Sequence, residues 1–577
     1  MKPYSLKKKS FEDSFGRLKF LMIVIFILGI IVVSRLFVLQ VLNYKFYKQQ
    51  AGLTHHLEKI LLAKRGLIKD VKGEILAFNI EKYLLYAVPA EIKDLTGTAH
   101  KLAPILNLDE ESKDFNQLKN KLARPGDFYE ILKRNLTPEE AIEIKEMGLP
   151  GIAIEKEFFR YYPEGELFAH VIGYLGIKDN IRQGQYGLEE YLEEELAGQS
   201  GSLKAEKSVG NILILGTTKK IDEPINGADI ILTLDKVIQR QACSVLKDGV
   251  LKTQAAAGSI IILDPKTGAV LAWCNWPSFD PNNYHQVRDY KLFSNAVSAW
   301  SIEPGSVFKL ITMAAALDTN QVTPETTYLD TGKVKIGGYI IRNADEKVYG
   351  EKTMTNVLEK SINAGAIFAA QKVGPDLFRA YVKAFGFGSL TGIEQPAESP
   401  GNIKNLEEKN PIYLATASFG QGLSVTPIQL VAAVGAIANS GKLMKPHLVK
   451  QIIKQNGKIQ INQPQVVRQV FKPETAITLS AMMVSVLEKG YGRLARVPGY
   501  YIAGKTGTAQ IPKTGQGYSQ EAIHSFVGFG PVDNPAFVGL VVIDRPKLGR
   551  FAESTAAPIF GQIADFLLKY YNIPPNR

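Results

Sequence analysis

The sequence of 577 residues is poor in the residues that mark several protein classes. Its two cysteines, Cys243 and Cys274, are too few for a disulfide framework, so the core must come from buried apolar side chains. Its seven histidines are scattered apart from the pair His55-His56, and neither a His-x3-His pair nor a carboxylate cluster predicts a metal site. Glycine and proline follow no Gly-X-Y period, and no repeat or low-complexity tract is visible, which excludes fibrous architectures.

The composition is otherwise that of a globular protein, with 45% apolar and 22% charged residues. The length favours roughly two to four domains. The net charge of +11 is compatible with a nucleic-acid binder, a membrane-surface protein or a ligand of an acidic polymer. The position of the charge along the chain must therefore decide among these classes.

Positive charge is concentrated at the N-terminus, where residues 1–19 hold six basic and two acidic side chains. Residues 20–42 follow with Arg35 as their one charge, a stretch long enough to cross a bilayer as a helix. Because no small-residue cleavage site closes this stretch, we expect an uncleaved anchor, with a cleaved signal peptide as the alternative. The basic residues before this stretch predict a cytoplasmic tail at residues 1–19 and place the rest of the chain outside the cytoplasm. Beyond the tail, the positive charge is spread along the chain, and no basic patch indicates a nucleic-acid binder.

No second apolar run of spanning length is present, so both cysteines are expected in an oxidising, extracytoplasmic space. Their apolar neighbours favour buried structural cysteines over a bridge or a reactive pair.

Two regions with different sequence patterns follow the anchor. Residues 43–220 contain short predicted strands near residues 65–76. They also contain a predicted helix that starts at the capping box of Thr137 and runs to about Met147, and a glutamate-rich helix between Gly184 and Gly201. No catalytic constellation is present there, which favours a scaffold or interaction module. Residues 221–577 have strands at 258–264, 269–276, 526–529 and 536–543 around helices such as 306–317 and 427–439. This order predicts an α+β domain whose sheet is completed by the C-terminus.

Ser306 and Lys309 are the first candidates for chemistry. They lie three residues apart at the start of an apolar helix, so the amine can reach the hydroxyl. Apolar surroundings should lower the pKa of the lysine and make it a usable base for a serine nucleophile. Alone, however, Ser-x-x-Lys is a weak signal, because a helix cap with a snorkelling lysine gives the same pattern.

Two further motifs strengthen this interpretation. Ser361-Ile362-Asn363 precedes a helix of small residues, and Lys505-Thr506-Gly507-Thr508 lies in an extended stretch suited to binding a carboxylate and an oxyanion. Ser-x-x-Lys, Ser-x-Asn and Lys-Thr-Gly in this order are the signature of penicillin-interacting enzymes. Residues 499–506 also match the P-loop expression, but their strand-forming residues exclude a phosphate-binding loop before a helix.

The chain resembles the class B penicillin-binding proteins along essentially its whole length, and within them the septal, division-type subgroup most. The resemblance rests on Arg65-Gly66 with Asp70 and Gly73, on Arg160-Tyr161-Tyr162-Pro163, on Gly187-Leu188-Glu189, on Glu303-Pro304-Gly305-Ser306, on Gly420-Gln421-Gly422, on Lys505 to Gln510 and on Ser525 to Phe529. It implies a single transmembrane anchor (20–42), a non-catalytic pedestal (43–220) and a transpeptidase domain (221–577) with a five-stranded antiparallel sheet flanked by helices.

The resemblance also implies a role for each motif residue. Ser306 would attack the penultimate D-Ala carbonyl of a peptidoglycan stem that ends in D-Ala-D-Ala, and Lys309 would accept its proton. Ser361 would relay a proton to the leaving D-Ala, Asn363 would position the substrate amide, and Lys505 would support the proton network. Thr506, Gly507 and Thr508 would bind the terminal carboxylate. The backbone amides of Ser306 and Thr508 would form the oxyanion hole.

No metal or organic cofactor is implied. The expected partners are stem peptides, β-lactams that acylate the same serine, the lipid bilayer of the bacterial inner membrane, a membrane glycosyltransferase and divisome proteins. The alternatives are an elongation- or sporulation-type transpeptidase, a catalytically silent β-lactam sensor or division scaffold, and a secreted β-lactamase.

Overall fold

The computed structural model describes residues 10–45, 56–124, 129–178, 181–206, 220–513 and 517–577. By its internal contacts the chain divides into two units, one of residues 1–63 and 199–225 and one of residues 64–198 and 226–577.

The first unit contains the predicted anchor. Helix α1 (Ser10–Phe37) continues into a π-helical turn, η1 (Val38–Leu42), and residues 16–42 form the one helix of the described chain that is long and apolar enough to span a membrane. The anchor predicted at 20–42 lies within this helix, whose apolar side chains are exposed. Four of the six basic residues of the predicted tail lie at positions 1–9, outside the described residues. The unit also holds a sheet of strands β1 (His56–Leu61), β8 (Gly201–Glu206) and β9 (Lys220–Asp222).

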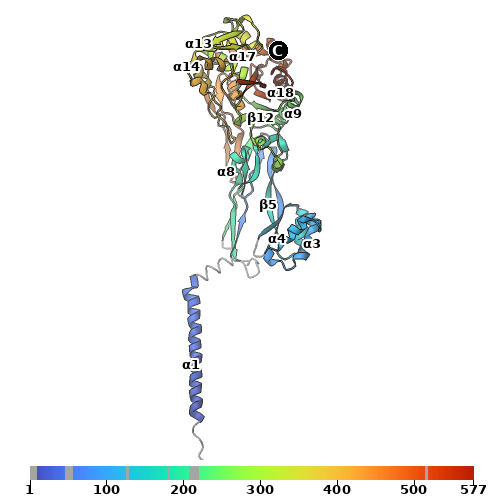
Figure 1. Ribbon diagram of the computed structural model, residues 1–577, viewed down its shortest axis with the longest axis vertical. Helices are drawn as coiled ribbons and strands as arrows, with labels where there is room; N and C mark the ends of the chain where they lie inside the picture. Colours follow the sequence, from blue (N-terminus) through green and yellow to red (C-terminus); the bar gives the residue numbers. More distant parts are fainter. Residues whose placement is uncertain (1–9, 46–55, 125–128, 179–180, 207–219, 514–516) are drawn as a thin grey trace, which may run out of the picture. The chain divides into compact units, whose positions relative to one another are not determined.

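In the second unit, residues 64–198 form a mixed region with a small core of its own. Its long strand β3 (Ile75–Ala87) pairs with β2 (Ile68–Lys69), β4 (Glu130–Leu136) and β5 (Ile152–Tyr161). Helices α3 (Leu95–Leu106), α4 (Lys113–Leu122) and α5 (Pro138–Glu146) enclose an apolar cluster that includes Phe115 and Leu122, coloured blue in Figure 1. The capping box predicted at Thr137 is confirmed.

The rest of this region consists of short elements. They are η2 (Pro89–Glu91), η3 (Gly165–Phe168), α6 (Ala169–Ile172), β6 (Tyr174–Lys178), β7 (Ile181–Gln185), α7 (Gly187–Tyr191) and α8 (Glu193–Ala197). The glutamate-rich segment thus forms two short helices, α7 and α8, instead of the one that was predicted. Strands β10 (Asp229–Leu232), β18 (Val449–Ile453) and β19 (Ile459–Ile461) extend the sheet of β2 and β3, so both halves of the second unit share one sheet.

The C-terminal half is built on the predicted five-stranded antiparallel sheet, in the order β12-β11-β23-β22-β21. Its strands are β11 (Ala257–Leu263), β12 (Val270–Trp276), β21 (Ala503–Lys513), β22 (Gly517–Gly530) and β23 (Phe537–Asp544). All four pairings are antiparallel, and the C-terminal strands complete the sheet as predicted.

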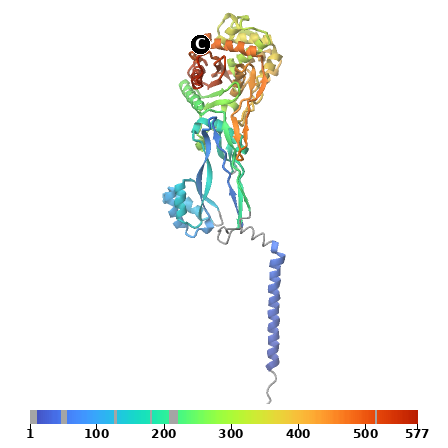
Figure 2. The same cartoon turned by 180° about the vertical axis from the view of Figure 1, so that it is seen from behind.

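Helices cover both faces of this sheet. The paired glycines Gly528 and Gly539 leave room for Phe560 of helix α18 (Ala556–Tyr570). Val538, whose side chain points to the opposite face, contacts helix α16 (Pro427–Ala438) at Gly435. Helix α9 (Lys236–Thr253) lies beside α18, as Figure 2 shows in green and red.

The segment between the two parts of the sheet is mainly helical. It contains η6 (Gly305–Phe308), α11 (Lys309–Asp318), α12 (Met354–Glu359), α13 (Asn363–Val373), α14 (Pro375–Ala384), α15 (Pro411–Ala417) and α17 (Pro473–Lys489). Its shorter elements are η4 (Pro281–Gln286), η5 (Tyr290–Phe293), α10 (Ala296–Ala299), β13 (Thr327–Asp330), β14 (Lys333–Ile336), β15 (Tyr339–Arg342), β16 (Gly350–Thr353), η7 (Lys404–Glu407), β17 (Lys442–Met444), β20 (Val466–Gln469) and η8 (Arg493–Ala495).

The prediction of two unpaired structural cysteines is wrong, because Cys243 and Cys274 form a disulfide. Helix α9 packs along strand β12, where the Gln239 amide donates to the Trp273 carbonyl at 2.8 Å and accepts from the Trp273 amide at 2.7 Å. This docking leaves the two cysteine Cα atoms 5.4 Å apart, within the range that a disulfide requires. The bridge is a tertiary contact that apolar neighbours in the sequence do not reveal.

Candidate active site

Ser306 lies in a tight turn at the entrance of helix α11. Pro304 and Gly305 lead into the 3₁₀ helix η6, and Gly305 adopts a φ of 56°, which favours glycine. The Gly305 amide donates to the Gly420 carbonyl at 3.0 Å, so the turn is held against the Gly420-Gln421-Gly422 segment. Since residues i and i+3 eclipse in a 3₁₀ helix, Ser306 and Lys309 face the same side. The Lys309 Nζ donates to the Ser306 Oγ at 3.1 Å.

The Lys309 side chain is 1% exposed and is surrounded by neutral oxygens. Its Nζ lies within hydrogen-bond distance of three more oxygens, the Ser361 carbonyl at 2.5 Å, the Ser361 Oγ at 3.2 Å and the Asn363 Oδ1 at 2.8 Å. Burial, together with the nearby charge of Lys505, holds the pKa of Lys309 well below its usual range, although Asp345 opposes the shift. This shift favours the neutral amine, whose lone pair can accept a proton from the neighbouring serine hydroxyl, as a general base requires.

Ser361 and Asn363 enter the same cleft from the link between helices α12 and α13. Ser361 adopts a φ of 53°, an uncommon conformation for a serine. Its Oγ accepts from both lysines, Lys309 at 3.2 Å and Lys505 at 3.0 Å. The Asn363 Nδ2 donates to the Arg342 carbonyl at 3.1 Å, which leaves its Oδ1 turned to Lys309. Ser361 therefore bridges the two lysines.

Lys505, Thr506, Gly507 and Thr508 lie on β21, the edge strand of the sheet next to the serine turn. The Lys505 side chain is fully buried, and burial lowers its pKa to about 7. A Cβ at Gly507 would collide with the Ser525 hydroxyl and the Val307 side chain, so only glycine lets the strand approach the turn this closely. As predicted, this segment is a strand, which excludes the phosphate-binding loop.

Ser306, Ser361, Thr506 and Thr508 line one cavity of about 280 Å³. Lys309 and Lys505 are buried behind this wall and reach it through their hydrogen bonds to Ser306 and Ser361. The backbone amides predicted for the oxyanion hole belong to Ser306, in the first turn of η6, and to Thr508, on the edge strand; both places leave amides without partners from the same element.

Sequence reasoning missed several residues of this cavity. Asp345 and Tyr491 also line it, and Asp345 accepts from the hydroxyls of Tyr349 and Tyr491. No motif marks these residues, because their place depends on how distant loops pack around the cleft.

Comparison with known proteins assigns the family. The penicillin binding protein transpeptidase domain matches residues 258–565, and the penicillin-binding protein dimerisation domain matches residues 60–232. The chain belongs to the penicillin-binding proteins. Because it joins both domains to one N-terminal apolar helix, this penicillin-binding protein is of class B and is a single-pass membrane protein.

Among its relatives, stage V sporulation protein D of Bacillus subtilis is 34% identical over 521 residues, which cover 89% of this chain and 79% of the relative. The probable peptidoglycan D,D-transpeptidase PenA of Neisseria meningitidis serogroup B is 34% identical over 580 residues, 100% of this chain and 96% of PenA. The crystal structure of penicillin binding protein 3 from Mycobacterium tuberculosis with aztreonam matches with a TM-score of 0.70 and 27% identity, over 90% of this chain and 98% of that structure.

Proposed function

We propose that this class B penicillin-binding protein is a peptidoglycan D,D-transpeptidase that works through a serine acyl-enzyme. The main support is the continuous hydrogen-bond chain from Ser306 through Lys309 and Ser361 to Lys505, in which Ser306 and Ser361 line one cavity. A nucleophile, a neutral base and a proton relay are the groups that acyl transfer between peptides needs.

In the proposed reaction, the Ser306 Oγ attacks the penultimate D-Ala carbonyl of a stem peptide, and its proton passes to the Lys309 Nζ. The backbone amides of Ser306 and Thr508 stabilise the oxyanion, a contribution of about 3 kcal/mol per donor. As the C–N bond breaks, Ser361 passes a proton to the amine of the leaving D-Ala. Lys309 returns its proton to Ser361, to which its Nζ is hydrogen-bonded. An amine from a second stem then attacks the ester and gives up a proton through Lys309 to the Ser306 Oγ, so that the new C–N bond replaces the C–O bond, the crosslink forms and Ser306 is regenerated.

The remaining residues would bind the substrate. Thr506 and Thr508 are proposed to hold the terminal carboxylate, with Gly507 allowing its close approach. Asn363 would position the substrate amide, and Lys505 would support the proton relay. β-Lactams would acylate Ser306 in the same way and remain bound.

We further propose the division of the chain into a cytoplasmic tail (1–19), an anchor in the inner membrane (20–42), a pedestal (43–220) and a transpeptidase domain (221–577) outside the cytoplasm. A membrane glycosyltransferase and divisome proteins are the proposed partners of the anchor and pedestal.

Septal synthesis is the proposed cellular role, and sporulation is a second candidate because stage V sporulation protein D is among the relatives. Depletion of the protein distinguishes these roles. Filaments are expected for a septal enzyme, rounded cells for an elongation enzyme, and normal growth with defective spores for a sporulation enzyme.

Labelling with a fluorescent penicillin tests the enzymatic function. The wild type should retain the label covalently, and Ser306→Ala should lose it. Ser389→Ala, which removes an exposed serine away from the cavity, serves as the matched control and should label normally. Undiminished labelling of Ser306→Ala would contradict the assigned nucleophile. Rapid release of the label by the wild type would favour a β-lactamase, and absence of labelling a silent scaffold.

A further inference from the structure

Lys309 becomes charged during the proposed reaction, and its hydrogen-bond partners carry no charge that balances it. When the Ser306 proton passes to the Lys309 Nζ, the O–H bond breaks, an N–H bond forms and the amine becomes an ammonium. The oxygens within hydrogen-bond distance of this amine belong to Ser306, Ser361 and Asn363 and are neutral. Lys505, on strand β21, adds a charge of the same sign. A buried ammonium in such surroundings is stabilised by an anion nearby.

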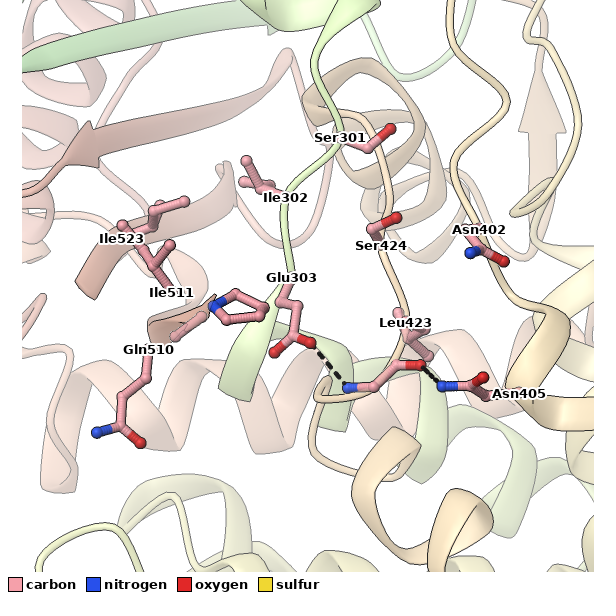
Figure 3. Close-up of a pocket in the computed structure, with 13 residues that line it drawn as sticks. Ser301, Ile302, Glu303, Asn402, Asn405, Leu423, Ser424, Gln510, Ile511 and Ile523 are labelled. Atoms are coloured by element: carbon pink, nitrogen blue, oxygen red, sulfur yellow. Dashed lines mark hydrogen bonds between the residues drawn. The ribbon is translucent and has the colours of Figure 1, made fainter. Parts of the chain in front are cut away.

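The carboxylates around the serine turn differ in the space that they face. Among the described residues that line the catalytic cavity, two carry a carboxylate, Asp345 and Glu553. Asp345 is the one whose charge acts on Lys309, in the direction that favours the ammonium. A third carboxylate, that of Glu303, lines a separate hollow, where its Oε1 accepts from the Gly422 amide at 3.0 Å (Figure 3). Asp345 is therefore the candidate for the balancing charge.

The backbone holds Asp345 close to the base. The loop between β15 and β16 carries it, and this loop is hydrogen-bonded to the start of helix α13. The Asn363 Nδ2 donates to the Arg342 carbonyl at 3.1 Å, and the Asn343 Oδ1 accepts from the backbone of α13 at 3.2 Å. The same Asn363 side chain lies 2.8 Å from the Lys309 Nζ through its Oδ1. One side chain thus connects the base to the loop that carries Asp345.

The carboxylate of Asp345 is fixed and ionised. Its Oδ2 accepts from the hydroxyls of Tyr349 and Tyr491, the latter at 3.5 Å, and lies 3.7 Å from the Lys347 Nζ. Burial alone would raise the pKa of Asp345, but the hydrogen bond from Tyr349 and the amide and charge of Lys347 lower it by more. Because Lys347 is exposed, water screens its charge and leaves that of Asp345 available to the cavity.

We infer that Asp345 is the counter-charge of the ammonium that Lys309 forms when Ser306 attacks. Asp345 exchanges no proton; its negative charge stabilises the ammonium and so strengthens Lys309 as a base. Because Asp345 acts through Lys309, it is a positioning residue. This inference rests on the proposed function and adds to it a residue that belongs to none of the three sequence motifs.

The test measures the second-order rate constant of acylation by benzylpenicillin against pH, with the full-length protein in detergent. The one carboxylic acid of benzylpenicillin is ionised from about pH 5 upward, so the midpoint of the profile reports on the protein. Asp345→Asn keeps the size of the side chain and removes its charge. Without the carboxylate the pKa of Lys309 falls, so the midpoint should move to lower pH by about one pH unit. The plateau rate should fall about threefold, because a weaker base accepts the serine proton less readily.

The other titratable groups around the base are the same in the wild type and in Asp345→Asn. Those that face Lys309, Asp345 or their cavity are Lys347, Tyr349, Lys360, Tyr491, Lys505 and Glu553. Lys505 has a pKa of about 7, and burial is what lowers it. A step in the profile that comes from Lys505 should therefore stay in place while the step from Lys309 moves.

Three further variants control for effects other than charge. Asp345→Glu keeps the carboxylate and should keep the wild-type midpoint. Glu553→Gln removes the other carboxylate of the cavity wall and, whatever its effect on the rate, should also leave the midpoint in place. Asp345→Ala is a second neutral variant and should shift the midpoint in the same direction as Asp345→Asn. Because the midpoint does not depend on the fraction of active protein, a partial folding defect in one variant does not mask the result.

An unmoved midpoint in Asp345→Asn, with or without a slower reaction, would overturn the inference. So would an equal shift in Glu553→Gln, because the effect would then belong to the general charge of the cavity. A wild-type rate that does not change with pH would also overturn it, since no titrating base would limit the reaction. A wild type that benzylpenicillin does not acylate would overturn the proposed function itself, and it is recognised before any variant is made.

Discussion

The proposed catalytic cleft contains two buried lysines whose hydrogen-bond partners are neutral oxygens. Lys309 and Lys505 are 1% and 0% exposed, and their amines meet on the hydroxyl of Ser361. Burial disfavours the ammonium form of each lysine, and the positive charge of Lys505 further disfavours that of Lys309. Burial and the proximity of Lys505 therefore both favour the neutral form of Lys309, the form that the proposed base requires.

The first prediction concerns the pH dependence of acylation. Because the pKa of Lys309 lies well below its ordinary value of 10.5, the neutral amine forms as the pH rises through this lowered pKa. The rate of acylation by benzylpenicillin should rise with pH and level off far below pH 10.5. Lys309→Arg keeps a permanent charge and should be slower by a factor of about 10²–10⁴. A midpoint near that of free lysine would contradict the role of base.

The second prediction separates the hydroxyl of Ser361 from its backbone conformation. Its φ of 53° is uncommon for serine but favourable for glycine. Ser361→Gly should therefore fold with at least the thermal stability of the wild type, while its acylation rate falls by a factor of about 10²–10⁴ because the relay is lost. Ser361→Ala should lose the same activity without the relief of backbone strain. Wild-type acylation by Ser361→Gly would show that Ser361 acts through its conformation alone.

At the scale of elements, the sequence predicted the features that adjacent residues encode, but not the contacts between distant segments. The strands of the main sheet and the helix at Thr137 follow from alternation and capping, which adjacent residues encode. Motif order brought Ser306, Lys309, Ser361 and Lys505 to notice, and the structure places them in one cleft. The disulfide was not predictable, because it depends on how helix α9 packs against strand β12, which the sequence pattern does not reveal.

Residues from three of the pedestal segments that resemble the family meet in one buried ion cluster. Glu189 is 0% exposed and accepts from the Arg65 Nε at 2.5 Å and from the Arg160 Nε at 2.7 Å. Arg65 also donates to Glu193 at 2.6 Å, and Arg160 to the Gly66 carbonyl at 2.7 Å. The cluster therefore joins α7 and α8 to strand β5 and to the segment before β2.

The third prediction is that Glu189→Gln lowers the free energy of unfolding by about 3–5 kcal/mol, because it removes the buried counter-charge of Arg160 and leaves Arg65 with Glu193 alone. Glu194→Gln, on the same helix pair but exposed, is the control and should change stability little. Burial alone would raise the pKa of Glu189. The positive charges and hydrogen bonds of Arg160 and Arg65 lower this pKa by more than burial raises it, so the net shift is downward. The stabilisation is therefore present above the ordinary value of 4.5 and is lost as the pH falls through the lowered pKa.

Denaturant unfolding of both variants across the acidic range measures this effect. The difference in stability between the wild type and Glu189→Gln should shrink in acid, whereas that for Glu194→Gln should stay near zero. A difference that does not depend on pH would contradict an ionised Glu189.

At the scale of the whole molecule, the net charge of +11 indicates topology more than a ligand. A net charge of +4 lies in residues 1–19, next to the membrane-spanning helix, and the remainder is spread over the rest of the chain. Positive charge beside a span is retained in the cytoplasm, so the proposed orientation puts the transpeptidase domain outside. The disulfide between Cys243 and Cys274 agrees with this orientation, because such bonds persist in oxidising compartments.

The last prediction tests this orientation in the full-length protein. Both native cysteines are in the disulfide, so a single introduced cysteine can report its own location. In spheroplasts, a membrane-impermeant maleimide should label Ser389→Cys, which lies at an exposed position of the transpeptidase domain. It should label Ser5→Cys, in the basic tail, only after the membrane is permeabilised, and the unsubstituted protein should remain unlabelled in both conditions. The reverse pattern would place the catalytic cleft in the cytoplasm, where a crosslinking enzyme could not reach the wall, and would overturn both the orientation and the proposed role.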